Sequence, residues 1–351
     1  MKLRHILVCL ILCAIAGSAF SADYQPRYLE ITFLTTNDLH AHDMPFTLPA
    51  DTKNNRPAVP DIGGLARIAT IVNRTRAEMR APVVLADSGD TTHGYTALPK
   101  AYHGASTIAA MNAMGYVALE PGNHEFQYHS SDTLRNLKDS KFPWVCANMV
   151  YKDTGKTFVE PYIIREIGGA RVAFFGLTNN LPKIQPKTYL AAPELGLDVL
   201  PAVDVAKKLV PELRRKADIV VLLSHLGRGA DVSLAQAVPG IDIILGGHSH
   251  SFIRTPQMVP VGQPSAFSLG TVPVVQAGYH GLDMGKTKVI FHRGADGRYT
   301  LMSCKGDLIT IDETIPDDPG IAKILADWTA RIPLPAPAPV KPAAPAQPTS
   351  K

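Results

Sequence analysis

Hydrophobic and polar positions along the chain form two alternating patterns. Short, nearly continuous apolar runs predict strands that are buried on both faces, and these runs lie at 29–36, 82–86, 171–177, 218–223 and 241–245. Between them, apolar residues recur every three or four positions, which predicts helices within 63–80, 106–114 and 203–216. This alternation is typical of a layered α/β protein.

The C-terminal part of the sequence has a different pattern. The stretches 273–276, 287–291 and 299–311 look purely β, which predicts antiparallel or mixed pairing there. An amphipathic stretch within 319–332 is expected to form a terminal or linker helix. Residues 333–351 are rich in Pro and Ala and cannot bury a core, so they are expected to form an extended, disordered tail.

The first residues of the chain resemble a secretory signal. Lys2 and Arg4 precede an apolar run at 6–16, and small residues around Ser21 offer a cleavage site. We therefore expect residues 1–21 to be a signal peptide and the mature protein to be periplasmic or secreted, with no stable membrane span. An uncleaved membrane anchor is the alternative reading of the same residues.

Composition and charge narrow the function. The 351 residues are 46% hydrophobic and 19% charged, as in an ordinary globular protein, and we expect one main domain at 27–318. Loss of Lys2 and Arg4 with the signal would lower the formal net charge of +4 by two. A nearly neutral chain is not expected to bind a nucleic-acid duplex. Cys146 and Cys304 would remain, either as a disulfide or as two separate buried thiols.

Five polar clusters follow strand-like runs and contain the residues that could carry chemistry. They lie at 37–43, 87–94, 121–126, 224–227 and 246–250. Ligands of open α/β sheets gather just beyond the carboxyl ends of strands, so this placement is informative. Each cluster alone is weak evidence, because Asp-x-His and Asp-Gly pairs often form turns and a single histidine often belongs to the core.

The donor atoms of the five clusters suit divalent metal ions. Asp38 and His40 alternate, so in an extended segment both would point to one side. Asp90 lies in a turn beside Gly89, where a carboxylate can bridge two cations. The complete set comprises seven candidate oxygen and nitrogen ligands: Asp38, His40, Asp90, Asn123, His225, His248 and His250. The set suits two divalent ions, and the absence of nearby thiolates disfavours a closed structural zinc site.

The order of these motifs resembles that of the calcineurin-like metallophosphoesterases. The details of the motifs, including 36–40, 123–126, 224–227 and 276–281, resemble the catalytic domain of the secreted 5′-nucleotidase group, over about 29–312. The resemblance implies an α/β fold that is a four-layered α/β/β/α sandwich of two mixed sheets.

The resemblance also implies a role for each candidate residue. One metal would be held by Asp38, His40 and His250, and the other by Asn123, His225 and His248, with Asp90 as the bridge. Asn123 and His124 would contact the substrate, and His124 would sit beside the scissile phosphate as a proton donor or charge stabiliser.

The implied reaction is hydrolysis of a phosphate ester of a nucleotide or a similar small molecule. Two divalent ions, expected to be Mn, Zn or Fe, with Mg or Ca as further options, would support in-line attack by a hydroxide that bridges them. A cyclic-nucleotide phosphodiesterase, a sugar-nucleotide hydrolase and a sulfur-compound hydrolase of the same fold remain alternatives. So does a non-catalytic metal-binding envelope protein.

The sequence departs from the family pattern at two points. Many 5′-nucleotidases carry an aspartate three residues after the His124 equivalent, but here Gln127 brings no negative charge to the imidazole. Family members with nucleotidase activity usually also have a C-terminal domain whose aromatic pair stacks the base. Nucleoside recognition is therefore expected to be absent, rebuilt locally or supplied by a partner. The aromatic side chains near the motifs are Tyr95, Tyr102, Phe126, Tyr128 and Tyr279.

Overall fold

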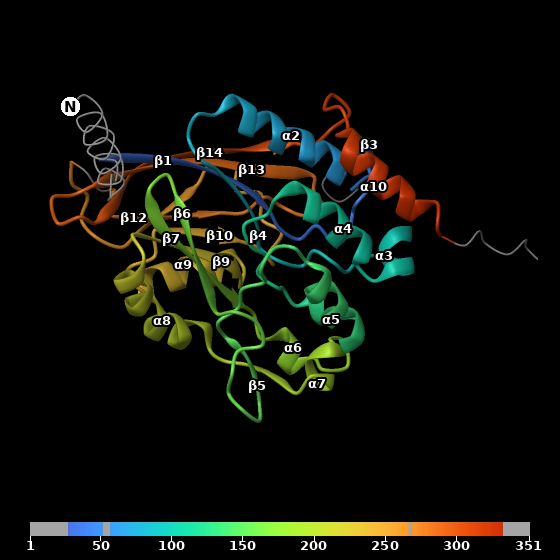
Figure 1. The fold of residues 1–351 in the computed structure, drawn as a ribbon, viewed down its shortest axis with the longest axis horizontal. Coiled ribbons are helices and arrows are strands. Elements are labelled where there is room, and N and C mark those ends of the chain that lie inside the picture. The colour runs from blue at the N-terminus through green and yellow to red at the C-terminus, as the bar shows by residue number, and fades with distance from the viewer. Residues whose placement is uncertain (1–26, 52–56, 267–268, 333–351) are drawn as a thin grey trace, which may run out of the picture.

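The computed structural model describes residues 27–51, 57–266 and 269–332. The expected signal peptide at 1–21 and the expected tail at 333–351 lie outside these residues. Within them, two larger sheets lie face to face, and helices cover the outer side of each (Figure 1).

The first sheet joins strands from both ends of the chain. It has four strands in the order β14-β13-β1-β4, with the bounds β1 (Tyr28–Thr36), β4 (Val83–Asp87), β13 (Asp283–Arg293) and β14 (Tyr299–Thr310). β1 pairs with β4 in parallel, whereas β13 is antiparallel to both β1 and β14. The mixed pairing predicted for the C-terminal strands is therefore confirmed.

The second sheet has a parallel centre and antiparallel edges. Its order is β11-β12-β10-β9-β7-β6. The strands are β6 (Tyr162–Ile167), β7 (Ala170–Thr178), β9 (Ile219–His225), β10 (Ile243–Gly246), β11 (Gln257–Pro260) and β12 (Thr271–Val275). β7, β9, β10 and β12 run in parallel, which buries their apolar runs on both faces.

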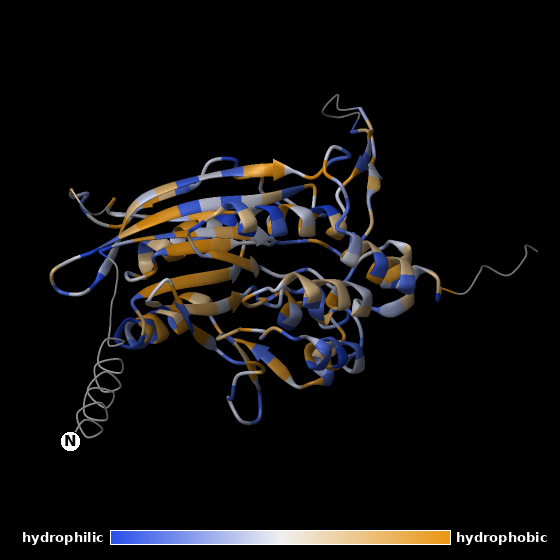
Figure 2. Cartoon of the chain, turned by 45° about the horizontal axis from the view of Figure 1, so that its top comes forward, coloured by the Kyte–Doolittle hydropathy of each residue, from blue (hydrophilic) through white to orange (hydrophobic). Residues whose placement is uncertain are grey.

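Alternation along the strands separates the layers. In β9, Val221 packs between the two sheets, whereas Leu222 packs against the outer helices. In β1, Phe33 likewise faces the other sheet, and Leu34 faces the helices of the opposite side. The outer helices are α2 (Leu65–Glu78), α4 (Ala105–Met114) and α10 (Pro319–Thr329) on one side, and α8 (Ala202–Lys216) and α9 (Arg228–Ala237) on the other. The predicted four-layered α/β/β/α sandwich is confirmed, and many residues of its central strands are hydrophobic (Figure 2).

Smaller elements connect the layers. The remaining helices are α3 (Ala97–Tyr102), the 3-10 helix η1 (His124–Phe126), α5 (Ser130–Asp139), α6 (Leu181–Ile184) and α7 (Ala191–Glu194). Two further sheets of two strands pair β2 (Phe46–Leu48) with β3 (Val59–Ile62), and β5 (Met149–Tyr151) with β8 (Leu197–Val199).

The helix α10 is packed into the domain. Asp318 caps its first turn by accepting hydrogen bonds from the backbone N–H groups of Gly320 and Ile321, each 3.0 Å long. Ile321 and Leu325 are buried in the same cluster as α2 and α4. The stretch expected to be a terminal or linker helix therefore contributes apolar side chains to the core.

Two further features bear on the sequence-based expectations. Cys146 is buried and Cys304 is half-buried, and both are free thiols, so the pairing alternative is wrong for this structure. None of the helices in the described residues combines the length and the apolar character needed to cross a membrane.

Candidate metal centre

Four of the five polar clusters follow strands that end at the same edge of the two sheets. β1 and β4 end at paired residues, Thr36 and Asp87, and β9 and β10 end close together because Ser224 pairs with Gly246. Parallel strands bring the loops after them to one edge. The cluster at 121–126 reaches the same edge without following a strand, because the residue before it that pairs with the end of β4, Leu119, forms only an isolated parallel bridge to Asp87.

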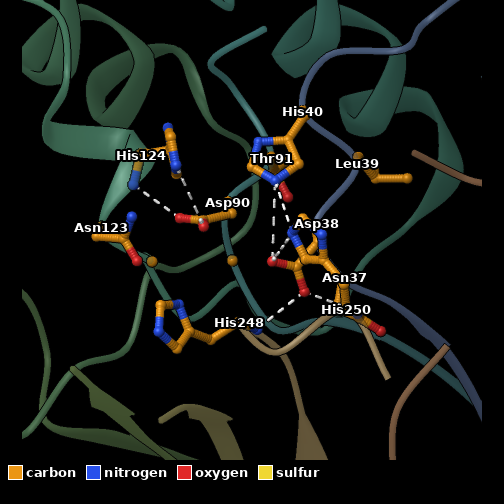
Figure 3. A network of polar contacts seen from close by, with 12 residues as sticks. Asn37, Asp38, Leu39, His40, Asp90, Thr91, Asn123, His124, His248 and His250 are labelled. Carbon is orange, nitrogen blue, oxygen red and sulfur yellow. Dashed lines mark hydrogen bonds and ion pairs between the residues drawn. The ribbon is translucent and has the colours of Figure 1, made fainter. Parts of the chain in front are cut away.

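The first group of donor atoms comes from the loops after β1 and β10. Asp38 Oδ1 lies 3.3 Å from His250 Nε2 and 3.9 Å from His40 Nε2. The two imidazole Nε2 atoms are 3.2 Å apart. The donor atoms of these three side chains therefore lie close enough together to bind one metal ion (Figure 3).

A second group forms around Asp90. Its Oδ2 lies 3.0 Å from His225 Nε2, and His248 completes a set whose donor atoms all lie within 4.8 Å of one another. His40, Asp90 and His124 form a third set by the same measure. Because Asp90 and His40 each belong to two sets, the groups are continuous, and Asp90 lies between His40 and His248 in Figure 3.

Asn123 reaches the second group through hydrogen bonds. Its Oδ1 accepts a 2.7 Å bond from Asn179 Nδ2, which also lies 3.4 Å from His248 Nδ1. Its own Nδ2 donates to the Tyr189 hydroxyl at 2.9 Å. An amide oxygen has two lone pairs, so Asn123 retains one for a further partner. All eight residues predicted for the site are therefore brought to one region, including His124 (Figure 3).

The backbone of the site is strained. Five of the seven predicted ligands have positive φ angles: Asp38 (50°), His40 (45°), Asp90 (56°), His248 (73°) and His250 (53°). Non-glycine residues in this region cost roughly 1–3 kcal/mol each, and such residues cluster at functional sites. The expectation that Asp38 and His40 converge from an extended segment is wrong, because a left-handed turn brings them together.

Backbone hydrogen bonds hold the loops after β1 and β4 in this shape. Asp38 N–H donates to Gly89 O at 2.8 Å, and His40 N–H donates to Asp90 O at 2.9 Å. The buried carboxylate of Glu125 accepts from four backbone N–H groups, at 2.7–2.9 Å, from Asp90, Thr91, Thr92 and Gly122. Glu125 therefore fixes the turn that carries Asp90.

Two residues that sequence reasoning did not assign also orient ligands. The Asn37 side chain donates to Asp38 Oδ2 at 2.7 Å and accepts from the backbone of Ala277 at 2.8 Å. Asn179 lies outside the five clusters, and only its tertiary contacts reveal it. For Glu125 and Asn37 the available signal was their position inside two of the clusters.

The imidazole of His225 is held in one orientation. Its Nδ1 lies 2.6 Å from the carbonyl oxygen of Ser88, which places the ring proton on Nδ1 and directs Nε2 toward Asp90. This arrangement is typical of a histidine ligand whose tautomer is fixed by the surrounding protein.

Electrostatics favour positive charge at the centre. Burial alone would lower the pKa of His225, but the carboxylate of Asp90 raises it to about 10. Burial would raise the pKa of Asp90, and the neighbouring His225 holds it well below its usual range. Burial lowers the pKa of His40 to about 4, so this imidazole keeps its lone pair at neutral pH. The site therefore stabilises a cation beside Asp90.

Unpartnered buried atoms fit a metal. Asp38 Oδ1 and His225 Nε2 are buried and make no hydrogen bond of good geometry among the described residues, and each faces another donor of the centre, His250 Nε2 at 3.3 Å and Asp90 Oδ2 at 3.0 Å respectively. Such atoms are costly to bury unless a ligand satisfies them. Carboxylate oxygen and imidazole nitrogen together suit borderline divalent ions such as Zn, Mn and Fe.

The surroundings of His124 differ from the expectation for Gln127. Gln127 could accept a hydrogen bond from the imidazole, yet both its Oε1 and His124 Nδ1 are buried without a hydrogen-bond partner in the described part of the chain. A neighbouring ring is that of His93, with its centroid 5.2 Å from that of His124. Burial lowers the pKa of His93 to about 4, so it supplies no charge of its own.

The five aromatic residues near the motifs have different environments. Phe126 is fully buried, and Tyr102 packs on Trp328 with ring centroids 4.7 Å apart. Tyr128 stacks on His103 at 4.4 Å, and Tyr95 is 71% exposed. Tyr279 alone among these five stacks on a predicted ligand, with its ring 4.9 Å from that of His250.

Comparison with known proteins agrees with this geometry. A family model described as calcineurin-like phosphoesterase matches residues 31–252. The 5′-nucleotidase of Bos taurus is 31% identical over 324 residues, which cover 87% of this chain and 54% of that protein. The 2′,3′-cyclic-nucleotide 2′-phosphodiesterase/3′-nucleotidase of Salmonella typhimurium is 28% identical over 320 residues, 83% of this chain and 48% of that protein.

A solved structure supports the same relationship. The 5′-nucleotidase precursor from Thermus thermophilus superposes with a TM-score of 0.72 at 28% identity, over 86% of this chain and 59% of that one. The chain spans about half the length of the curated relatives it matches. It belongs to the calcineurin-like phosphoesterase family and resembles the catalytic domain of 5′-nucleotidases.

Proposed function

We propose that this chain is an exported phosphoesterase that uses two divalent metal ions to hydrolyse phosphate esters of nucleotides or similar small molecules. The observation that carries the proposal is the convergence of three overlapping donor sets around Asp90 and His40. Family membership and the nucleotide-related names of the relatives agree with it. Export rests on the signal-like residues 1–21 alone, and the catalytic domain is assigned to residues 27–318.

Each donor has a place in this proposal. Asp38, His40 and His250 would hold one ion, Asn123, His225 and His248 would hold the other, and Asp90 would be shared by both. Manganese, zinc or iron fits the mixture of oxygen and nitrogen donors, and magnesium or calcium is a further option. When bound, the two ions supply an activated water and neutralise charge on the phosphoryl oxygens.

In this proposal, His124 donates a proton to the leaving group. Its backbone N–H donates to Asp90 Oδ1 at 2.7 Å, which anchors the residue to the centre. Its Nε2 lies 3.9 Å from Asp90 Oδ2, so the imidazole edge faces the centre (Figure 3). From there Nε2 can donate a proton to the leaving oxygen, and Asn123 and His124 together orient the phosphate.

A diester substrate is the second candidate. The Salmonella relative's name includes a 2′,3′-cyclic-nucleotide 2′-phosphodiesterase, so the same centre in this chain would take a cyclic nucleotide. Sugar nucleotides contain a phosphoryl group like that of nucleotides, so they are tested as substrates as well. A metal-binding protein without turnover is the alternative from another class.

The test measures metal content and hydrolysis together. Wild-type protein loaded with Mn²⁺ is assayed with chromogenic phosphate monoesters and diesters, then with nucleotides, cyclic nucleotides and sugar nucleotides. The Asp90→Asn substitution is expected to lower turnover by at least about a hundredfold and to reduce bound metal. The control is Asp296→Asn, which makes the same chemical change at a side chain 64% exposed in the β13–β14 connection.

Three results would decide against the proposal. If the protein stays metal-free after loading, the chain has no dinuclear metal centre. Metal binding without turnover of any ester supports the non-catalytic alternative. Equal activity in the Asp90→Asn and Asp296→Asn variants would show that the reaction takes place elsewhere.

A further inference from the structure

An aromatic groove lies beside the candidate metal centre. Its volume is about 630 Å³, within the usual range for small-molecule sites, and its walls include His42, Phe46, Tyr279 and His280. These residues come from the loop after β1, from β2 and from the loop after β12. All four are half-buried, so each exposes part of its ring to the groove.

The rings of the groove form a stacked wall. His42 and His280 stack with centroids 3.7 Å apart and planes inclined by 21°. Phe46 packs on His42 at 4.6 Å, and its ring lies 6.1 Å from His280 at a steep angle of 75°. Aromatic rings in such offset and edge arrangements present flat π surfaces that favour another flat ring.

The same residues contact the predicted metal ligands. Tyr279 stacks on His250 with centroids 4.9 Å apart and planes inclined by 20°. His280 meets His40 edge-on at 5.5 Å, and its backbone N–H donates to Asp38 O at 2.7 Å. The groove therefore begins where the first donor group ends, and a molecule held at the centre can extend into it.

The charge of the groove argues against a second phosphate. Among the described residues that line it there is no Lys or Arg, and Asp51 contributes a carboxylate. An anionic group would meet no Lys or Arg among these described lining residues, whereas an uncharged flat ring would bury apolar surface and stack.

We propose that this groove binds the aromatic ring of the alcohol half of the phosphate ester, a ring of the nucleobase class, while the phosphate lies at the metal centre. This inference rests on the proposed phosphoesterase function. It places base recognition within the catalytic domain itself, on the stacked wall of His42, Phe46 and His280.

Phe46 is the residue on which to test the groove. It lies on β2, where it pairs with Ile62 of β3, and its ring packs against the backbone of Gly63. It is not one of the seven predicted ligands, so its loss leaves the donor set intact. Phe46→Ala removes the ring, and Phe46→Leu removes only its aromatic character while keeping an apolar side chain.

The kinetic test compares adenosine 5′-monophosphate with ribose 5-phosphate, which lacks the base. With the Mn²⁺-loaded full chain, Phe46→Ala is expected to lower kcat/KM for the nucleotide about tenfold, mainly through KM. Its kcat/KM for ribose 5-phosphate should stay within about twofold of wild type. The control is Tyr28→Ala, which truncates a ring that is 48% exposed at the far end of β1.

The outcomes separate the two proposals. Equal losses for both substrates, or no loss for either, in Phe46→Ala and Phe46→Leu would overturn the groove assignment. Far-UV circular dichroism identifies a variant that fails to fold, and Phe46→Leu then carries the test. If wild type hydrolyses neither ester, the phosphoesterase proposal fails by itself.

A binding measurement then tests the groove without turnover. Saturation-transfer NMR of the full chain with adenosine, and with ribose as the reference, reports contact with the base directly. Transfer to adenosine in wild type and its loss in Phe46→Ala would support the groove. Absence of transfer in wild type, or its full retention in Phe46→Ala, would overturn it.

Discussion

His124 and Gln127 show how one side chain can change the chemistry of the centre. The buried Nδ1 of His124 has no hydrogen-bond partner among the described residues, and the amide oxygen of Gln127 is unpartnered as well. A carboxylate at position 127 would accept a hydrogen bond from Nδ1 and stabilise the protonated ring. The negative charge that Gln127 does not supply would therefore act at one atom, His124 Nδ1.

We expect Gln127→Asp to increase turnover of esters with poor leaving groups by roughly tenfold, because these need a proton from His124. The pH–rate profile should remain high to a higher pH than in wild type, since the added charge favours the imidazolium. Gln263→Asp, at an exposed position, is the matched control. Unchanged rates for poor and good leaving groups would contradict this role of position 127.

At the scale of the element, α10 contributes to the stability of the domain. Leu325 is 1% exposed and packs in the cluster that holds α2, α4 and the outer face of the first sheet. The ring of Trp328, in the same helix, lies 4.7 Å from that of Tyr102. A helix that served only as a linker would not bury such side chains.

Leu325→Ala is expected to lower the free energy of unfolding by about 3 kcal/mol, the usual cost of removing a buried leucine from a well-packed core. Urea denaturation followed by circular dichroism measures the change. Lys323→Ala is the control in the same helix, because its side chain is 74% exposed. Equal midpoints for both variants would show that α10 folds independently of the domain.

At the scale of the whole molecule, buried carboxyl groups set the pH dependence of stability. Burial raises the pKa of Asp43, Asp87 and Asp231 to about 7 each. Their unfolded value is 3.8, so between roughly pH 4 and 7 the native state binds more protons than the unfolded state. These groups therefore make the protein less stable as the pH rises through that interval.

Asp43→Asn isolates one of these contributions. The side chain accepts hydrogen bonds from Ser106 Oγ at 2.9 Å and Thr107 Oγ1 at 2.8 Å, and either hydroxyl can rotate to accept from an amide. The free energy of unfolding should then fall less steeply between pH 4 and 7, by up to about 1.4 kcal/mol per pH unit. Parallel curves for variant and wild type in urea titrations at several pH values would refute the assignment.

Much of the fold and the donor set was predictable from the sequence, for local reasons. Continuous apolar runs identified β1, β4, β7, β9 and β10, because strands buried on both faces need them. Motif order then identified the family. The η1 segment was less predictable, since Leu119 before it forms only an isolated bridge. The strained φ angles of Asp38 and His40 could not be predicted, because contacts with distant segments stabilise them.

The sequence by itself determined most of the strands and helices and the residue types of the centre, because strand and helix periodicities and metal-donor chemistry are properties of short segments. The order of the layers was expected only from the resemblance to the family. Only the tertiary structure decided which metal-donor side chains lie together and which residues surround them. Asn37 bonds to Ala277, Glu125 closes the turn at Asp90, and His42 stacks on His280. Such contacts join segments that lie far apart along the chain, and no local pattern encodes the distance between them.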